Sequence, residues 1–550
     1  MTQIDENAPT FNLWTEPWIV LEHPHGELSQ HSISDVLAWA HEYTAIYDPS
    51  PLVVVGIHRL LIAILQDALD LRENSDLDRL WLNGKFPKDK IEEFGRQYTD
   101  RFDLFSRDKP FFQSADLPIF PDEKDRKISK PIAQLFPETP SGSLVTHYRH
   151  TTDEEQVFSP AVVALGLVTI PPFITSGGAG LMPSINGVPP IYVLPSGRTL
   201  FESLAASLLT EHWLDKYVSV QNDLAWWKRT IPVVVQESKK MKPSMTFSEH
   251  HQLSEVGYLH GLTFPARKVR VYPERMNAIC SRTGQLSEWC VRRMTFRMGE
   301  SCLDKSGWQW QDPFVAYQLP LKPSRKRKST VSKKKSDKPQ PIRPKRNKTP
   351  WREFTGLFLQ HEDINQQTRR PLFLNQFAEL EVAKNIQTYP FRCIAWQTDG
   401  KMKYYEWTDF GFDIPPILLQ DPYGAMWTEQ ALSFANECAD IVKRVFSNTF
   451  RRDVKSPEHF KHLKDRLEAD YWSVLSERFR QYVLDLGDQT KQKETFEKWL
   501  DTVVREAKYA FNKTADITGN DGNILLKIER GKEECRKKLN DLRNKTKQGG

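Results

Sequence analysis

The chain has 550 residues, which is too many for one hydrophobic core, so two or three domains are expected. Its hydrophobic content of 39%, with 16 Trp and 30 Phe, excludes a disordered protein. Six cysteines form no CxxC pair, which predicts neither a disulfide framework nor a structural zinc site. The N-terminus does not resemble a signal peptide. The longest apolar segment, Leu52–Leu65, contains His58 and Arg59 and is too short to span a bilayer, so a cytoplasmic protein without membrane association is expected.

The net charge of +5 conceals two regions of opposite sign. Residues 322–348 (KPSRKRKSTVSKKKSDKPQPIRPKRNK) contain 13 Lys or Arg and one Asp, a local charge of +12. The remainder of the chain therefore carries 5 − 12 = −7. The segment has no apolar periodicity, so we expect residues 322–350 to form a disordered basic insert in an otherwise acidic protein.

The first half of the chain predicts several helices around one long loop. A helix begins near Ser34, and Pro51–Leu71 has the spacing of an amphipathic helix. Another helix is predicted over Pro87–Phe105, whose proline suits a first turn. Residues 116–155 are rich in Pro, Asp, Ser and Thr, and a loop of this length is usually functional or disordered. A further helix is predicted over Ser159–Val168.

The most unusual stretch is Thr169–Gly197, where five glycines and six prolines lie between apolar flanks. Gly177, Gly178 and Gly180 have no Cβ, so their backbone can approach a partner closely. The pattern matches neither the Walker loop nor GxGxxG. It indicates either a long surface turn or a rigid loop that places bare backbone against a ligand such as a nucleic-acid groove. We refer to residues 177–182 as the glycine loop.

Beyond this stretch, a helix is predicted over Leu200–Lys216 and strands over much of 217–320. Residues 268–272 (KVRVY) alternate polar and apolar side chains, as a half-buried strand does. After the basic insert, Trp351–Leu359 predicts a helix. Pro390–Tyr405 then has the pattern of a hairpin with a tight turn at Gly400.

The C-terminal part has long helical periods, with breaks near Pro457, Gly487 and 518–523. Two apolar stripes, one beginning at Leu463 and the other at Phe496, predict the core of an antiparallel bundle. The sequence therefore predicts an α+β protein, with a mixed α/β domain over 1–420 followed by a four-helix bundle over 421–550.

No catalytic motif is found: HExxH, GxSxG and a carboxylate pair beside a glycine-rich loop are all missing from the sequence. His147 and His150 would be too few for a metal site, which needs three or four ligands. A binding protein is favoured over an enzyme, with no cofactor and no metal. Two alternatives stay open: a stand-alone basic nucleic-acid-binding protein without guide RNA, and a metal-dependent nuclease.

Five segments, in this order, resemble the large subunit of the type I-E CRISPR surveillance complex Cascade, the CasA family. They are FNLWTEPWIVL (11–21), KPFFQ (109–113), the glycine loop with the RTLFESL that follows (177–204), FPARKVRV with CSRTG (264–284), and WQTDGKMKYYEWTDFGFDIP (396–415). The similarity runs over nearly the whole chain. It implies a DNA-reading domain followed by a four-helix bundle.

The resemblance implies a protein that recognises the protospacer-adjacent motif in foreign double-stranded DNA and helps open the duplex for R-loop formation. Pairing with crRNA would then carry sequence specificity. The implied partners are double-stranded target DNA, crRNA, the backbone and small subunits, the crRNA 5′-end subunit, and a helicase-nuclease that the chain helps to recruit.

The resemblance also implies site residues, with departures from the family pattern. The wedge tip has Thr398-Asp399-Gly400-Lys401 where the family has Asn-Gln, and Arg275 or Arg282 replaces a lysine finger. Some relatives carry two CxxC-like pairs. In this chain residues 157–160 replace the first pair, and of the second pair only Cys280 is kept. The expected nucleic-acid-binding residues are, in the glycine loop and directly before it, Ser176, Gly177, Gly178 and Gly180; in the middle segment, Arg275 and Arg282; at the wedge, Thr398, Asp399, Gly400 and Lys401; in a loop that meets guide RNA or a neighbouring subunit, Val145, His147 and Tyr148; and in the insert, Arg325, Lys326, Arg327, Lys328, Lys333, Lys334 and Lys335.

Overall fold

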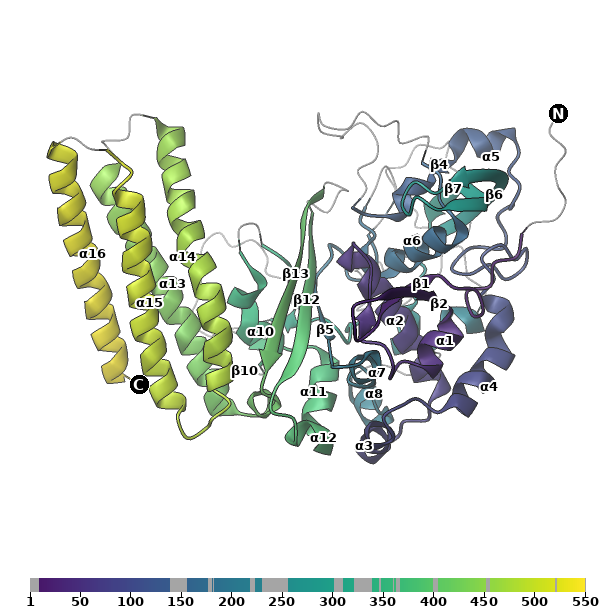
Figure 1. Ribbon diagram of the computed structural model, residues 1–550, viewed down its shortest axis with the longest axis horizontal. Coiled ribbons are helices and arrows are strands. Elements are labelled where there is room, and N and C mark those ends of the chain that lie inside the picture. Colours follow the sequence, from purple (N-terminus) through teal and green to yellow (C-terminus); the bar gives the residue numbers. More distant parts are fainter. Residues whose placement is uncertain are drawn as a thin grey trace. The chain divides into compact units, whose positions relative to one another are not determined.

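The computed structural model describes residues 9–138, 156–176, 181, 183–217, 223–229, 256–300, 310–320, 339–345, 348–359, 361–362, 367–398, 404–451, 456–519 and 522–549. Its mixture of helices and sheets confirms the α+β class (Figure 1). The chain forms two compact units. The first comprises Met1–Lys348, Arg370–Asn385 and Pro390–Gly411, and the second comprises Thr349–Arg369, Ile386–Tyr389 and Phe412–Gly550. The domain boundary that we expect after residue 420 stays a prediction.

The first unit begins with a small antiparallel sheet. β1 (Ile19–Glu22) lies between β2 (Leu28–His31) and β3 (Ala45–Ile46). α1 (Ile33–Ala38) follows, and its N-cap Ser32 accepts a hydrogen bond from the amide of Asp35. Further helices of this unit are α3 (Asn74–Asn83), α4 (Lys88–Tyr98), α5 (Glu123–Ile128), α9 (Tyr258–Leu262), α11 (Leu372–Glu379) and α12 (Glu381–Lys384).

α2 (Pro51–Ala68) is the central helix of the first unit, and the expectation of one apolar stripe was wrong. Every residue from Pro51 to Leu65 is buried, including His58 and Arg59. The cause is tertiary: α2 packs against α6 (Pro160–Phe173), and a Cβ on Gly56 would lie 2.6 Å from the carbonyl oxygen of Val168. Glycine therefore permits this close approach of two helices. Among the described residues, α2 alone is long and apolar enough to cross a membrane, but 83% of it is buried, as in a core helix.

α6 continues further than the sequence suggested. The helix runs through Pro171 and Pro172 to Phe173, so the irregular backbone begins about one turn later than the predicted end at Val168. Thr169 lies in this extra turn, and its hydroxyl donates to the carbonyl oxygens of Gly166 (2.7 Å) and Leu135 (3.0 Å). Pro171 and Pro172 have no backbone N–H group and cannot donate the usual helical hydrogen bonds. The side-chain hydrogen bonds of Thr169 and the burial of this turn therefore stabilise it.

The helix predicted over 200–216 is two helices, α7 (Leu200–Ala205) and α8 (Glu211–Tyr217). Between them, the hydroxyl of Ser207 donates to the carbonyl of Ser203, and Thr210 donates through both its amide and its hydroxyl to Gln376. These side-chain bonds compete with helical main-chain bonds and account for the break.

Two longer antiparallel arrangements complete the first unit. β6 (Arg267–Ile279) pairs with β7 (Leu286–Met298), and β4 (Lys130–Pro131) lies on the other side of β7. The start of β6 is buried on both faces, not half-buried as its alternating pattern predicted. In a second sheet, β12 (Tyr389–Thr398) lies between β5 (Ile191–Pro195) and β13 (Tyr404–Ile414), which confirms the strands of the predicted hairpin (Figure 1).

The second unit is built on four long helices: α13 (Pro422–Phe450), α14 (Pro457–Asp485), α15 (Gln492–Ala515) and α16 (Gly522–Gly549) (Figure 1). Both predicted stripes supply core residues, from Leu463, Leu467 and Leu475 on α14 to Phe496, Leu500 and Val503 on α15. α10 (Phe354–Phe358) and the short strands β10 (His361–Glu362) and β11 (Gln367–Arg369) belong to the same unit.

Candidate nucleic-acid interface

Ser176, Arg275, Arg282 and Thr398 are the predicted site residues that the structure describes. The others lie outside the described residues: Gly177, Gly178, Gly180, Asp399, Gly400, Lys401, Val145, His147, Tyr148, Arg325, Lys326, Arg327, Lys328, Lys333, Lys334 and Lys335. The site is therefore built here from the segments that carry these residues.

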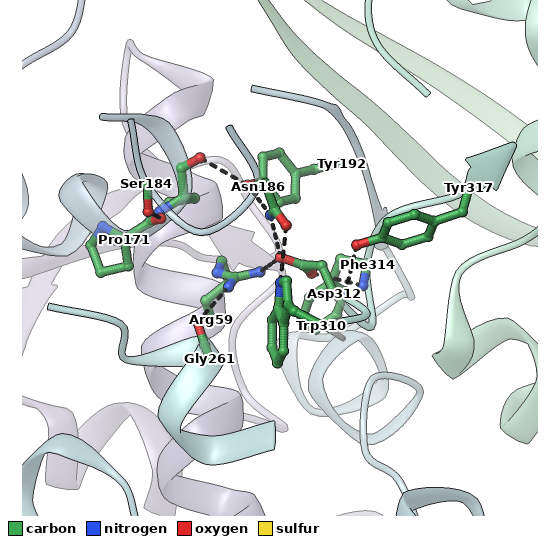
Figure 2. Close-up of polar contacts among 11 residues, drawn as sticks. Arg59, Pro171, Ser184, Asn186, Tyr192, Gly261, Trp310, Asp312, Phe314 and Tyr317 are labelled. Atoms are coloured by element: carbon green, nitrogen blue, oxygen red, sulfur yellow. Dashed lines mark hydrogen bonds and ion pairs between the residues drawn. The ribbon is translucent and has the colours of Figure 1, made fainter. Parts of the chain in front are cut away.

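The entry and exit of the glycine loop are hydrogen-bonded to each other at its base. The amide of Ser184 donates to the carbonyl of Ile174 (2.9 Å), and the Ser184 hydroxyl donates to the carbonyl of Pro171 at the end of α6 (Figure 2). On the entry side, the buried guanidinium of Arg267 donates to the carbonyl of Thr175 (2.7 Å). Burial lowers the pKa of Arg267 to about 9, so this side chain stays charged at neutral pH.

The exit side of the loop forms a tight turn, residues 184–188, which we call the exit turn. The amide of Gly187 donates to the carbonyl of Ser184 (2.8 Å), and Gly187 adopts φ +70°, a conformation that favours glycine. Arg343 approaches from a distant part of the chain and donates to the carbonyl oxygens of Val188 (3.0 Å) and Asn186 (3.2 Å).

A buried polar cluster lies beneath the exit turn (Figure 2). The guanidinium of Arg59 on α2 contacts the Asp312 carboxylate at 2.6 Å, and both side chains are almost fully enclosed. The Asn186 amide group donates to the same carboxylate (2.8 Å), and its oxygen accepts from the Trp310 indole (2.9 Å). Asn186 therefore joins the exit turn to α2 and to the segment that precedes the basic insert.

Two tyrosines extend this cluster. The Tyr192 hydroxyl donates to the carbonyl of Pro172 (2.9 Å), and the Tyr317 hydroxyl accepts from the amide of Asp312 (2.9 Å) (Figure 2). Burial raises the pKa of both phenols, so both stay protonated at neutral pH. Buried networks of this kind are rigid, because breaking any of their hydrogen bonds leaves a desolvated polar atom.

The two arginines predicted on the middle segment are in different surroundings. Arg282 contacts Asp48 (2.5 Å) and Glu138 (3.6 Å), and its guanidinium lies 4.2 Å from the ring centroid of Phe136. Its charge is thus matched by carboxylates of the same unit. Arg275 on β6 pairs with Glu288 on β7 (2.7 Å), and 60% of its side chain is exposed. Of the two, Arg275 is better placed to release Glu288 and bind a DNA phosphate instead.

Cys280, the cysteine retained at the β6–β7 turn, is buried beside Cys290 and accepts a hydrogen bond from the amide of Ser159 (3.4 Å). Hydrogen bonds to Cys280 outweigh its burial and lower the pKa of its thiol. Within the described part of the chain, no three His, Cys, Asp or Glu side chains come together as a metal site would require.

The supporting residues Arg59, Asn186, Asp312 and Arg343 were missed by the sequence reasoning. One signal was available: an arginine in the middle of an apolar helix needs a buried partner. Nothing local identified that partner, because Arg59 and Asp312 are 253 positions apart.

This architecture has one unit built on a helical bundle and one mixed unit, in which other segments hold the base of the glycine loop. It resembles that of solved CRISPR-associated proteins. The crystal structure of Cse1 from Acidimicrobium ferrooxidans superposes with a TM-score of 0.75 at 19% identity, covering 98% of this chain and 100% of that one. A chain of a CRISPR RNA-guided surveillance complex matches with a TM-score of 0.69 at 16% identity, covering 97% of this chain and 100% of that one.

The sequence comparisons extend the likeness to a family. The model of CRISPR-associated protein Cse1 matches residues 12–510. CRISPR-associated protein CasA/Cse1 of Thermus thermophilus is 26% identical, over 97% of this chain and 98% of that protein. The chain therefore belongs to the Cse1 (CasA) family, the Cascade large subunits, and the predicted resemblance is confirmed.

Proposed function

We propose that this Cascade large subunit reads the protospacer-adjacent motif in foreign double-stranded DNA through main-chain atoms of the glycine loop. The observation that carries the proposal is the bracing of the loop's base: Ile174 accepts a hydrogen bond from Ser184 of the exit turn, while Arg267 and Arg343, from other segments, donate to Thr175 and to the exit turn. A base that is fixed in advance loses little conformational entropy when the loop binds. Main-chain groups suit the minor groove, whose pattern of donors and acceptors is degenerate, so such reading tolerates more than one motif.

The hairpin of β12 and β13 would then act as a wedge. Its strands are described up to Thr398 and from Tyr404, and the ion pair between Arg392 and Asp409 joins them. The tip, with Asp399, Gly400 and Lys401, lies outside the described residues. A tip placed beside the first opened base step offsets unstacking, which costs a few kcal/mol. Guide RNA then pairs with the opened strand and supplies sequence specificity.

The partners follow from family membership and from the likeness to a chain of an RNA-guided surveillance complex. These support crRNA and the other Cascade subunits as partners, which we infer to be the backbone and small subunits and the crRNA 5′-end subunit; we further propose that the chain helps to recruit a helicase-nuclease. The segment containing Val145, His147 and Tyr148 would meet guide RNA or a neighbouring subunit. The chain itself acts in the cytoplasm as a recognition subunit and catalyses no reaction.

The basic insert would add DNA affinity that does not depend on sequence. Part of its surroundings is described: β8 (Tyr317–Gln318) precedes the insert, β9 (Gln340–Pro341) lies within its C-terminal part, and the two strands pair antiparallel. β9 leads to Arg343, which contacts the exit turn. The residues between these two paired strands, which hold most of the insert's cations, are therefore connected at both ends to the base of the glycine loop, where the cations would meet the same duplex.

The proposal is tested by band shifts of the assembled complex on a series of DNA duplexes that differ only in the motif. Gly178→Asp should weaken binding to the preferred motif at least about tenfold, since a carboxylate would enter a groove lined by phosphates. Gly522→Asp at the start of α16 is the matched control, because nothing lies within 4 Å of a Cβ there. Equal binding of all motifs by the unmodified complex would overturn the proposal.

Co-purification tests the alternative of a stand-alone nucleic-acid-binding protein. Expressed with its neighbouring genes and a guide RNA, the chain should elute with RNA and several partner chains. Elution alone, with DNA binding intact, would favour the alternative.

A further inference from the structure

Arg343 has an unusual set of partners for a half-buried guanidinium. It donates to the carbonyl oxygens of Val188, Asn186 and, more weakly, Pro341 (3.5 Å). Its acceptors are main-chain atoms, and no carboxylate is recorded against it within the described part of the chain. Burial lowers the pKa of Arg343, which is a cost of placing it here. A charged side chain used in this way fixes the backbone that it contacts.

The backbone that Arg343 contacts is the exit turn of the glycine loop. A Cβ on Gly187, in the middle of that turn, would lie 3.5 Å from the Arg343 guanidinium. The neighbouring strands support the same junction: the amide of Ile191 donates to the carbonyl of Ile342 (2.9 Å), and the amide of Ile342 donates to Ala316 (2.8 Å). These bonds fix the main chain of Ile342 beside β5, so the neighbouring Arg343 is held in contact with the exit turn.

Asn186 connects the exit turn both to Arg343 and to the buried cluster. Its carbonyl accepts from Arg343, while its side-chain amide is bound between Asp312 and Trp310 (Figure 2). The residue is held at its main chain from one side and at its side chain from the other. The exit turn therefore has one position relative to the buried cluster.

We propose that Arg343 and Asn186 are positioning residues for motif recognition: they fix the exit turn at the base of the glycine loop. This inference rests on the proposed function. It predicts that Arg343 contributes to motif discrimination without touching DNA. Loss of hydrogen bonds from a charged donor typically changes an equilibrium by about tenfold or more.

The experiment measures dissociation constants of the assembled complex for a preferred and a scrambled motif, over a range of salt concentrations. Arg343→Ala should weaken binding to the preferred motif by about tenfold and leave the scrambled motif unchanged. Its salt slope should equal that of the unmodified complex, since a lost phosphate contact would reduce the slope by about 0.9. Arg343→Lys, which keeps the charge and one donor direction, should recover part of the discrimination.

Lys345→Ala is the matched control, because it removes the same charge from an exposed side chain two residues away. A reduced salt slope for Arg343→Ala, or equal losses on both motifs, would overturn the inference by making Arg343 a direct or nonspecific contact. Unchanged discrimination with a native circular dichroism spectrum would also overturn it. Absence of any motif preference in the unmodified complex would instead overturn the proposed function, so the two failures are distinguishable. If Arg343→Ala does not fold, Arg343→Gln supplies the same comparison, because it removes the guanidinium contacts with the exit turn while leaving a polar side chain of similar shape.

Discussion

His58 is enclosed in the same core that supports the glycine loop. Its Nε2 lies 2.9 Å from the Ser207 hydroxyl, and its ring packs edge-on against Phe314. Burial, and then the positive charges of Arg59 and Arg392, lower the pKa of His58 to about 3. The imidazole is therefore neutral in the folded protein throughout the physiological range, although histidine in an unfolded chain titrates near 6.5.

This difference makes stability depend on pH. Between pH 6.5 and pH 3 the unfolded chain binds a proton at His58 that the folded chain does not, so stability falls as pH falls. From pH 7 to pH 5 the loss from this residue is about 2 kcal/mol. His58→Gln, which keeps a polar group near Nε2, should remove that part of the pH dependence in urea titrations. His25→Gln, at an exposed position, should leave it intact, and an unchanged dependence in His58→Gln would contradict the prediction.

At the scale of elements, the sequence predicted best where local pattern and burial agree. The breaks near Pro457 and Gly487 and the stripe beginning at Phe496 located the long helices, because a bundle buries one face of each. The predictions failed where the fold overrides local pattern. α6 passes through two prolines, and the break between α7 and α8 depends on Gln376, which no local pattern could indicate. The alternation of 268–272 gave no sign that Arg267, Lys268 and Arg270 are all buried.

The contact of α2 with α6 provides a test at this scale. Gly56→Ala would place a Cβ 2.6 Å from the carbonyl oxygen of Val168, a main-chain atom that cannot move without displacing α6. Overpacking of this kind costs about 1–3 kcal/mol, and we expect the loss in chemical denaturation. Gly411→Ala on β13 is the control, since its nearest neighbour is 3.9 Å away. Because α6 ends at the base of the glycine loop, Gly56→Ala should also reduce motif discrimination. Equal stability of the two variants would contradict the prediction.

At the scale of the whole molecule, the supports of the candidate site come from distant parts of the sequence. The glycine loop and the hairpin were visible as local patterns, whereas their supports were not. Arg59, Asn186, Asp312 and Arg343 come together only through the fold. The basic insert was also evident from the sequence, and the structure adds that β8, which precedes it, pairs with β9 in its C-terminal part beside the exit turn.

The charge distribution predicts the salt dependence of DNA binding. Without residues 322–348 the chain carries a net charge of −7, which disfavours approach to DNA, and the insert supplies +12. If six of its cations meet phosphates, they contribute a slope of about 5 in the plot of log K against log salt concentration. Replacing Arg325, Lys326, Arg327, Lys328, Lys333, Lys334 and Lys335 by Ser should therefore flatten the salt dependence for every duplex alike. The ratio of affinities for preferred and scrambled motifs should be preserved, because the insert acts on phosphates and the glycine loop reads the motif. An unchanged slope would leave the insert as a solvated linker, and a lost ratio would assign motif reading to the insert itself.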